Sequence, residues 1–390
     1  MSEREEFLLV LGLIYLAECL RWVRRGGVVF RRVLGPRWFR QDYSEFLAND
    51  RGDLHWTWPF PDLGEFLVAR GIPWSLGPLG VATWHPASRH PQGRTSQTLH
   101  FRSWDELQVI EVDAQKITVG GRPWWIADTP VEANRLTAMM RRLVKIEPNA
   151  RAAAITAELN STFNVRSIQG RIECTRVGLK SLRGLANGLF LLLFGVGPAA
   201  VWRFGWLPVL PLVLAGVYVA SGWIAWLTVR RHRDWYPEVP EERFKLGLLA
   251  ALSPVTAIRS GDILGRCRVE NFEPMAVALA LFPTAIAAAW VAAWARDAHY
   301  PRLPENPFPV ATSGAETVVW FTEQYRQAGD AAIRAAGLNP ALGHQPPAQT
   351  ERVHTQYCPR CQAQFQVSAI ACQSCGGRAL LPLPQSRPLP

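Results

Sequence analysis

The long hydrophobic runs of this 390-residue chain almost lack charge. Apart from Glu18, no Asp, Glu, Lys, Arg or His lies within their cores, and no internal repeat relates one run to another. Ion and proton pathways through a membrane usually need such residues, and many transporter folds are built from repeats. The sequence therefore argues against a transporter or a pump.

Recognised catalytic motifs are absent as well. The chain has no glycine-rich phosphate loop, no His-Glu-x-x-His pair and no Gly-x-Ser-x-Gly elbow. The loop around His85, Ser88 and His90 places a His pair beside a Ser, but no carboxylate stands at a recognisable spacing from them. We therefore expect a polar loop and no catalytic residue. The alternative is an enzyme whose site is assembled from scattered residues such as His85, His90 and Asp262.

Lysine is scarce, with 4 residues against 38 arginines, and the net charge is +10. A basic chain can bind nucleic acid or a membrane surface. Here the arginines cluster directly after hydrophobic runs, and no basic face with interleaved aromatics suits a nucleic acid. Many of the 17 Trp stand near the ends of the same runs, where an indole fits the headgroup region. The pattern indicates a membrane protein without a nucleic-acid partner.

Four runs are apolar enough to predict transmembrane helices, at residues 7–23, 185–202, 206–229 and 275–295. The first has an acidic leading end and no signal-peptidase site, so we expect a retained anchor. Only Arg203, Phe204 and Gly205 separate the second and third, which should form a hairpin, and the Gly-Val-Gly-Pro segment at 195–198 should kink the second. The expected fold class is a multi-pass α-helical membrane protein with four or five spans.

Basic residues also predict the orientation. Seventeen Lys and Arg lie on one side of the runs, in residues 21–43, 164–184 and 230–245. Only Arg4 and Arg203 lie on the other side. Because cytoplasmic flanks are rich in Lys and Arg, we expect the N-terminus outside and residues 24–183 in the cytoplasm. The abundance of Arg, Ala, Pro and Trp is typical of a GC-rich bacterial source, which suggests the cell (inner) membrane.

Residues 24–165 carry short alternating runs and turn residues, typical of an antiparallel α+β domain. Two runs, 109–112 and 116–119, should pair as a hairpin, and a capping box at Thr129–Glu132 should start an amphipathic helix. This succession of strands, hairpin and closing helix over residues 54–145 resembles the bacterial PH-like domains. The resemblance implies a seven-stranded barrel capped by a helix and used for binding or assembly. An unrelated small α+β domain is the alternative.

A basic juxtamembrane helix is expected at residues 166–183, just ahead of the hairpin. Its side chains suit anionic lipid head groups, so membrane lipids are expected partners. The basic residues are Arg166, Arg171, Arg176, Lys180 and Arg183.

Four of the seven cysteines form the one specific motif of the chain. Cys358-Pro-Arg-Cys361 and Cys372-Gln-Ser-Cys375 are separated by ten residues and followed by two glycines, which allow positive φ in the turn. Each Cys-x-x-Cys turn directs two thiolates at one centre, and two such turns complete a tetrahedron around Zn²⁺. Residues 355–382 resemble the zinc-ribbon family, which implies one structural Zn²⁺ per chain held by these four residues. Two disulfides are the alternative, expected only outside the cytoplasm.

The side of the membrane on which the ribbon lies depends on residues 244–266. This stretch is apolar but short and interrupted by Pro254, so it either crosses the membrane or lies along its surface. The short apolar length of this stretch, taken alone, favours a helix that lies along the membrane surface. A zinc ribbon needs a reducing compartment, which favours a crossing, because a fifth span would return the C-terminus to the cytoplasm. Residues 296–354 are typical of a Pro-rich linker, with a helix at 315–336.

Together these features predict a non-enzymatic membrane protein that scaffolds, assembles or regulates other proteins through its cytoplasmic domain and its ribbon. Every recognised module is of a binding type, and no small-molecule substrate is identified. The alternative is a membrane enzyme or a subunit of a transport or export machinery. Lipid sensing by residues 166–183 is a third hypothesis.

Overall fold

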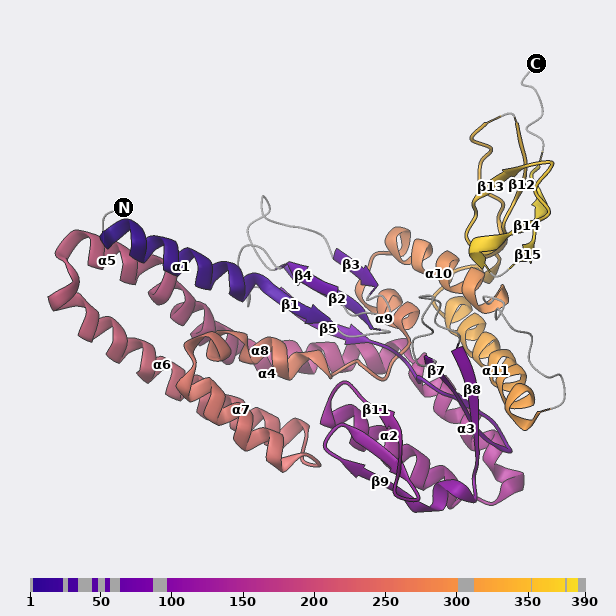
Figure 1. Cartoon of the computed structure of the whole chain (residues 1–390), viewed down its shortest axis with the longest axis horizontal. Coiled ribbons are helices and arrows are strands. Elements are labelled where there is room, and N and C mark those ends of the chain that lie inside the picture. Colours follow the sequence, from indigo (N-terminus) through magenta and orange to yellow (C-terminus); the bar gives the residue numbers. More distant parts are fainter. Residues whose placement is uncertain are drawn as a thin grey trace, which may run out of the picture. The chain divides into compact units, whose positions relative to one another are not determined.

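The computed structural model describes residues 3–23, 27–33, 44–47, 53–56, 64–86, 97–300, 312–351, 353–375 and 377–384 (Figure 1). Contacts divide the chain into two compact units. The first comprises residues 1–71, 111–138 and 167–271, and the second comprises residues 72–110, 139–166 and 272–390. The expected domain at 24–165 and its PH-like part at 54–145 are therefore each divided between two units.

The first unit contains the helices of the predicted hairpin and of the predicted N-terminal span (Figure 1). They are α1 (Glu3–Cys19), α4 (Val165–Leu191), α5 (Gly197–Phe204) and α6 (Trp206–Trp235). A π-helical turn, η3 (Leu192–Val196), stands where the sequence predicts a kink, and the Gly197 amide donates to the Leu192 carbonyl. Pro198 has no amide hydrogen, so the regular helical ladder is interrupted here.

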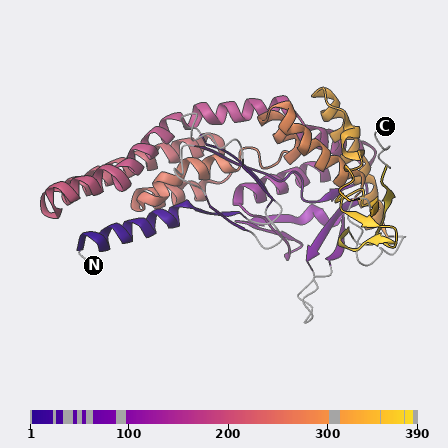
Figure 2. The same cartoon turned by 90° about the horizontal axis from the view of Figure 1, so that it is seen from above.

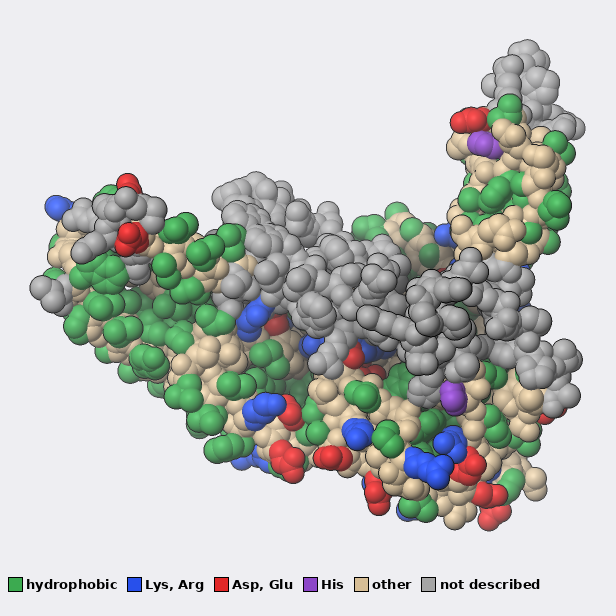
Figure 3. Space-filling model, viewed as in Figure 1, with side chains coloured by type: hydrophobic (Ala, Val, Ile, Leu, Met, Phe, Trp, Pro, Cys, Tyr) green, Lys and Arg blue, Asp and Glu red, His purple; other side chains and the backbone are tan. Residues whose placement is uncertain are grey.

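The predicted helical hairpin remains largely uncovered in the structure. Residues 165–204 and 208–235 are the two described helices that are long and apolar enough to cross a membrane. Only 28% of the most apolar window of each is buried, whereas the core helix of a soluble protein would be mostly buried. Hydrophobic side chains cover this end of the unit (Figure 3), among them Trp202, Phe204, Leu212, Val219 and Trp223.

The other expected spans take different forms. Residues 7–23 form α1 and strand β1 (Leu20–Val23), residues 244–266 form α7 (Pro240–Leu252) and α8 (Pro254–Arg266), and residues 275–295 form α9 (Pro274–Leu281) and α10 (Thr284–His299). Pro254 and Pro283 end the preceding helices because proline lacks an amide hydrogen and disfavours helical backbone before it. Residues 244–266 and residues 275–295 therefore do not form the single helix of about 20 residues that a crossing requires.

Small residues let the helices of the first unit pack closely. Gly178 of α4 lies against the indole of Trp235 on α6, where a Cβ would have no room. α7 and α8 both pack on α6. α1 runs beside the hairpin (Figures 1 and 2), and the Tyr15 ring lies 5.8 Å from that of Phe190 and 5.5 Å from that of Phe194.

The strands pair in small antiparallel sheets. In the first unit, β1 pairs with β4 (Asp53–Trp56), β2 (Val28–Val33) lies between β3 (Ser44–Leu47) and β5 (Gly64–Ala69), and β10 (Lys116–Val119) lies between β9 (Ile110–Asp113) and β11 (Arg122–Ile126). In the second, β7 (Gly80–Pro86) lies between β6 (Ser75–Leu76) and β8 (Gln97–Ser103). The hairpin predicted at 109–119 is confirmed, but within the described ranges the strands do not close a seven-stranded barrel.

The capping box is confirmed in a modified form. α2 spans Pro130–Val144, and the Thr129 hydroxyl accepts a hydrogen bond of 3.1 Å from the Glu132 amide. The Glu132 carboxylate accepts from the amide of Asp128, at 2.8 Å, instead of from that of Thr129. The first bond satisfies an amide that the first helical turn leaves unpaired, and the second satisfies the amide of the residue just before the cap.

The second unit brings together segments that lie before and after the hairpin in the sequence. α11 (Ser313–Ala335) packs on α3 (Pro148–Thr162), α10 and the β6–β8 sheet. The Thr156 hydroxyl donates to the Gln324 amide oxygen at 3.0 Å. The Phe163 ring lies 5.3 Å from that of Tyr325 and 5.9 Å from that of Trp294. α9 and α10 are therefore parts of a packed core, although their composition resembles a membrane span.

Candidate functional site

The C-terminal ribbon is a set of short strands, and the first cysteine of each Cys-x-x-Cys pair lies at a strand end. β12 (His354–Tyr357) lies between β13 (Gln364–Gln366) and β16 (Leu381–Pro382), and β14 (Ala371–Cys372) pairs with β15 (Arg378–Ala379). Cys358 follows β12, and Cys372 ends β14. β12 and β14 therefore each lead directly into one Cys-x-x-Cys turn.

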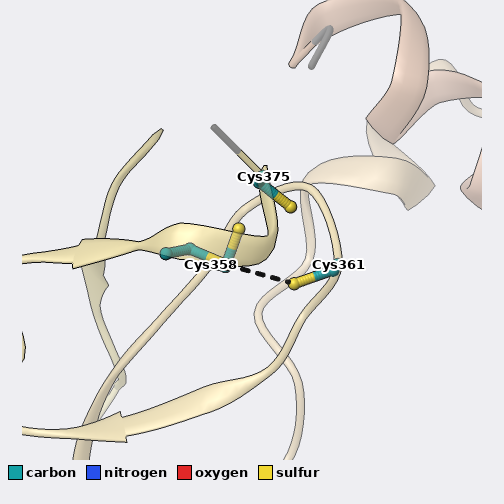
Figure 4. Close-up of side chains that lie close together, drawn as sticks. Cys358, Cys361 and Cys375 are labelled. Carbon is teal, nitrogen blue, oxygen red and sulfur yellow. Dashed lines mark hydrogen bonds between the residues drawn. The ribbon is translucent and has the colours of Figure 1, made fainter. Parts of the chain in front are cut away.

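The four cysteine sulfurs converge on one point. They all lie within 4.8 Å of one another, and the Cys361 and Cys372 sulfurs are 3.7 Å apart. Figure 4 shows the side chains of Cys358, Cys361 and Cys375 directed toward one another. A tetrahedral Zn²⁺ with Zn–S bonds of about 2.3 Å places its sulfurs about 3.8 Å apart. The four residues therefore fit a four-sulfur metal site, and all four are free thiols rather than disulfides.

Local backbone geometry sets these turns. The Gln362 amide donates to the Cys358 carbonyl at 2.9 Å, and Gln362 itself has a φ of 58°. Gly377 has a φ of 78°, so the prediction of positive φ is confirmed there, while Gly376 lies outside the described residues. Phe365 packs against the cysteine cluster.

The thiols of the cluster differ in how readily they ionise. Burial raises the pKa of the Cys372 thiol to about 12. Burial also opposes ionisation of Cys375, but a hydrogen bond from Arg360 lowers the pKa of this thiol. A divalent cation binds thiolates, so its binding releases protons from these sulfurs.

Arg360, inside the first Cys-x-x-Cys turn, connects the cluster to α10. One guanidinium nitrogen lies 4.0 Å from the Cys375 sulfur, and another lies 3.1 Å from the Asp297 carboxylate. The Arg378 guanidinium lies 5.6 Å from the centre of the Tyr300 ring, at the end of the same helix. The ribbon therefore has its own contacts with the body of the second unit.

Replacing Arg360 with glutamine should loosen the ribbon and leave its metal in place. The pair with Asp297 is partly exposed and should contribute about 1 kcal/mol or less. We expect cleavage between α11 and the ribbon to accelerate about three- to fivefold in limited proteolysis, with an unchanged metal content. Asp297→Asn should accelerate this cleavage to a similar extent, and the double variant should be cleaved little faster than either single variant. Fully additive effects, or no effect, would contradict the contact. Arg334→Gln, at an exposed position of α11, is the control.

The basic residues expected to face lipid lie on α4. Arg166, Arg171 and Lys180 are exposed, and Arg176 and Arg183 are half-buried. Arg176 lies 3.5 Å from Glu173. Their binding to lipid stays a prediction.

The residues of the alternative enzyme site are placed only in part. His85 lies on β7 of the second unit, and Asp262 is buried on α8 of the first. His90 lies outside the described residues.

A cluster of buried charges in the first unit was missed by sequence reasoning. Arg70, just after β5, forms an ion pair with Asp128 and lies 4.0 Å from Glu132 and 3.6 Å from Glu270. The Arg70 side chain is 9% exposed and that of Glu270 is 0% exposed. Arg266 approaches the same Asp128 carboxylate at 3.9 Å. Nothing in the sequence links Arg70 to Glu270, because their partnership depends wholly on the packing of β5 near α8.

Burial, followed by repulsion from Glu270, raises the pKa of Glu132 to about 7. Attraction to Arg70, Arg135 and Arg266 opposes this rise. A carboxyl whose folded pKa exceeds its ordinary value of 4.5 stabilises the fold fully below pH 4.5, and this contribution is lost as the pH rises to about 7.

Glu132→Gln should therefore flatten the pH dependence of stability. Gln keeps an oxygen that accepts from the Asp128 amide but has no charge to bury. Relative to the variant, the wild-type protein should lose about 3 kcal/mol of unfolding free energy between pH 4 and pH 8. Thermal unfolding in detergent across this range measures the difference, with exposed Glu106→Gln as control. Parallel profiles for wild type and Glu132→Gln would contradict the assignment.

No family model, curated protein or solved structure matches this chain.

Proposed function

We propose that this protein is a non-enzymatic, membrane-anchored scaffold or assembly factor that presents a structural zinc ribbon to a protein partner in the cytoplasm. The observation that carries the proposal is a pair of exposed apolar side chains on the ribbon. Ile370 is 92% exposed and Val367 is 76% exposed, in the loop between β13 and β14. Exposed apolar groups on a small rigid module favour docking to another protein.

Zinc is the metal that suits four thiolates in a tetrahedral arrangement. Cys358, Cys361, Cys372 and Cys375 would occupy all four positions, so no position would remain for a water or a substrate. The metal would hold the loops of the ribbon in place, which keeps Val367 and Ile370 on a rigid surface.

We propose three membrane spans: α1, the α4–α5 helix and α6. The exposed apolar faces of the hairpin and the contact of Tyr15 with it support this arrangement. At 17 residues, α1 rises about 26 Å, which is near the lower limit for a crossing. The basic residues in 21–43 and 230–245 would then lie on the cytoplasmic side.

The composition of the second unit supports a cytoplasmic ribbon without a hidden crossing. Residues 72–110 and 139–166 precede the hairpin, residues 272–390 follow it, and all belong to one compact unit. Segments packed together in a unit that contains none of the proposed spans lie on the same side of a membrane. Residues 244–266 and 275–295 then need not cross, and the thiolates remain in a reducing compartment.

Reporter fusions after residues 100, 262 and 390 test the topology, and all three should report the cytoplasm. A periplasmic signal at residue 390 would overturn the three-span arrangement. This measurement is independent of any partner.

Photo-crosslinking in cells tests the docking function. A crosslinker in place of Ile370 should form a discrete protein adduct, and one in place of Ser374, an exposed polar position of the same ribbon, should not. The adduct should disappear when Val367 is changed to serine. Equal labelling from both positions, or none from position 370, would contradict docking through this loop. Turnover of a substrate by the purified protein would instead favour the enzyme alternative.

A further inference from the structure

A hollow of about 310 Å³ lies on α6, where the hydrophobic part of this helix gives way to its basic part. It is lined by Trp226, Val229, Arg230 and Arg233. We propose that this hollow is a binding site for one anionic phospholipid, whose phosphate contacts the two arginines. The proposal rests on the membrane-spanning role of α6 proposed above.

The lining residues have the polarity that such a lipid requires. Positions 226, 229, 230 and 233 recur at helical spacing, so they share one face of α6. Trp226 and Val229 form the apolar end of the hollow, and Arg230 and Arg233 form its basic end. The Arg230 guanidinium lies 5.7 Å from the centre of the Trp226 ring. This cation–π contact holds the guanidinium at the edge of the apolar surface before any ligand binds.

The position along the helix matches the depth of a phosphate. From Trp206 to Val229 the helix rises about 36 Å, and the hydrocarbon core of a bilayer is about 30 Å thick. Arg230 and Arg233 would therefore reach the headgroup layer on the cytoplasmic side, where the leaflet carries anionic lipids. The apolar end of the hollow would remain beside the acyl chains, which a soluble phosphate compound lacks.

Charge complementarity also selects an anion for this hollow. Arg233 lies 3.7 Å from the carboxylate of Asp234, and both side chains are exposed, so their pairing is weak. A second hollow of the first unit, about 220 Å³, has the opposite character because four of its lining residues are acidic. These are Asp113, Glu238, Glu241 and Glu242. Arginine pairs with phosphate through two parallel N–H···O bonds, which favours the α6 hollow.

The test measures lipid binding to the full-length protein in detergent by native mass spectrometry. Phosphatidylglycerol is the probe, and phosphatidylcholine is the uncharged comparison. We expect one phosphatidylglycerol to bind more tightly than phosphatidylcholine. Arg230→Gln and Arg233→Gln should each weaken this binding about fivefold, and the double variant about thirtyfold. Arg231→Gln is the matched control, because it removes one charge from the next residue, which does not line the hollow.

Equal affinity for the two lipids would overturn the proposal, because the arginines would then not select an anion. An equal loss of phosphatidylglycerol affinity in Arg231→Gln and Arg230→Gln would also overturn it, because that result indicates general charge attraction. Inorganic phosphate that competes as well as the lipid would also overturn it. Carbonate extraction of cell membranes, made on the same variants, separates this inference from the membrane proposal. Release of the wild-type protein by carbonate would refute the membrane anchor itself. Retention of every variant with unchanged lipid selectivity would refute the lipid site alone.

Discussion

Replacing Cys372 with serine should remove the metal from the protein and unfold the ribbon. Cys372 is buried, and its sulfur lies 3.7 Å from that of Cys361. The described core of the ribbon is small, because the buried Cys358, Cys372 and Cys375 are joined by only a few apolar side chains, namely Tyr357, Phe365, Leu380 and Leu383. A structural zinc contributes on the order of 10 kcal/mol to a unit of this size, far more than so few apolar side chains can supply.

The measurement is the zinc content per chain of the purified full-length protein, together with limited proteolysis of the ribbon. The wild-type protein should carry one zinc, and Cys372→Ser should carry almost none and lose residues after α11 to the protease. Cys174→Ser removes an exposed cysteine of α4 outside the cluster, so its zinc content should be unchanged. Full zinc content in Cys372→Ser, or a wild-type protein isolated with two disulfides and no metal, would rule out the zinc ribbon.

Replacing Arg70 with methionine should destabilise the first unit by about 3–5 kcal/mol, which is the range for breaking a buried ion pair. Asp128, Glu132 and Glu270 would lose their central cation and remain in a poorly hydrated environment. Methionine has a similar length and keeps most of the apolar contacts of the arginine stem. The change in stability should therefore report the charge rather than a cavity.

Thermal unfolding in detergent tests this prediction with two comparison variants. Arg102→Met breaks an ion pair with Glu106 at 3.5 Å, in which the arginine side chain is 38% exposed, and should cost less than about 1 kcal/mol. Adding Glu270→Gln to Arg70→Met should recover part of the loss, because one fewer carboxylate is left without a cation. Equal effects of Arg70→Met and Arg102→Met, or no recovery in the double variant, would show that the buried cluster does not depend on Arg70.

Features that depend on neighbouring residues were predictable from the sequence. The hairpin around residue 114 and the helix start at Thr129 follow from turn and capping chemistry within a few residues. The meeting of four cysteines follows from two Cys-x-x-Cys turns and the short connection between them. In each case the interacting residues are close in the sequence, so the spacing of residue types predicts the local geometry.

Features that depend on distant segments were not predictable in this way. Hydropathy reports that residues 275–295 avoid water, but a lipid bilayer and a protein core satisfy this requirement equally well. In the structure Met275, Ala276, Val277 and Ala278 are buried, and Pro283 separates two short helices. Arg70 and Glu270 are far apart in the chain, and no local pattern pairs them.

The sequence by itself determined that the chain has long uncharged runs, an asymmetric distribution of arginine and a four-cysteine motif, because composition and short spacing carry this information. Only the tertiary structure decided which apolar runs lie largely uncovered on α4–α6 and which pack one face into a core as α9 and α10. It also placed residues 272–390 in one unit with residues 72–110 and 139–166. The physical reason is that burial depends on which surfaces meet, and segments far apart in the chain supply those surfaces.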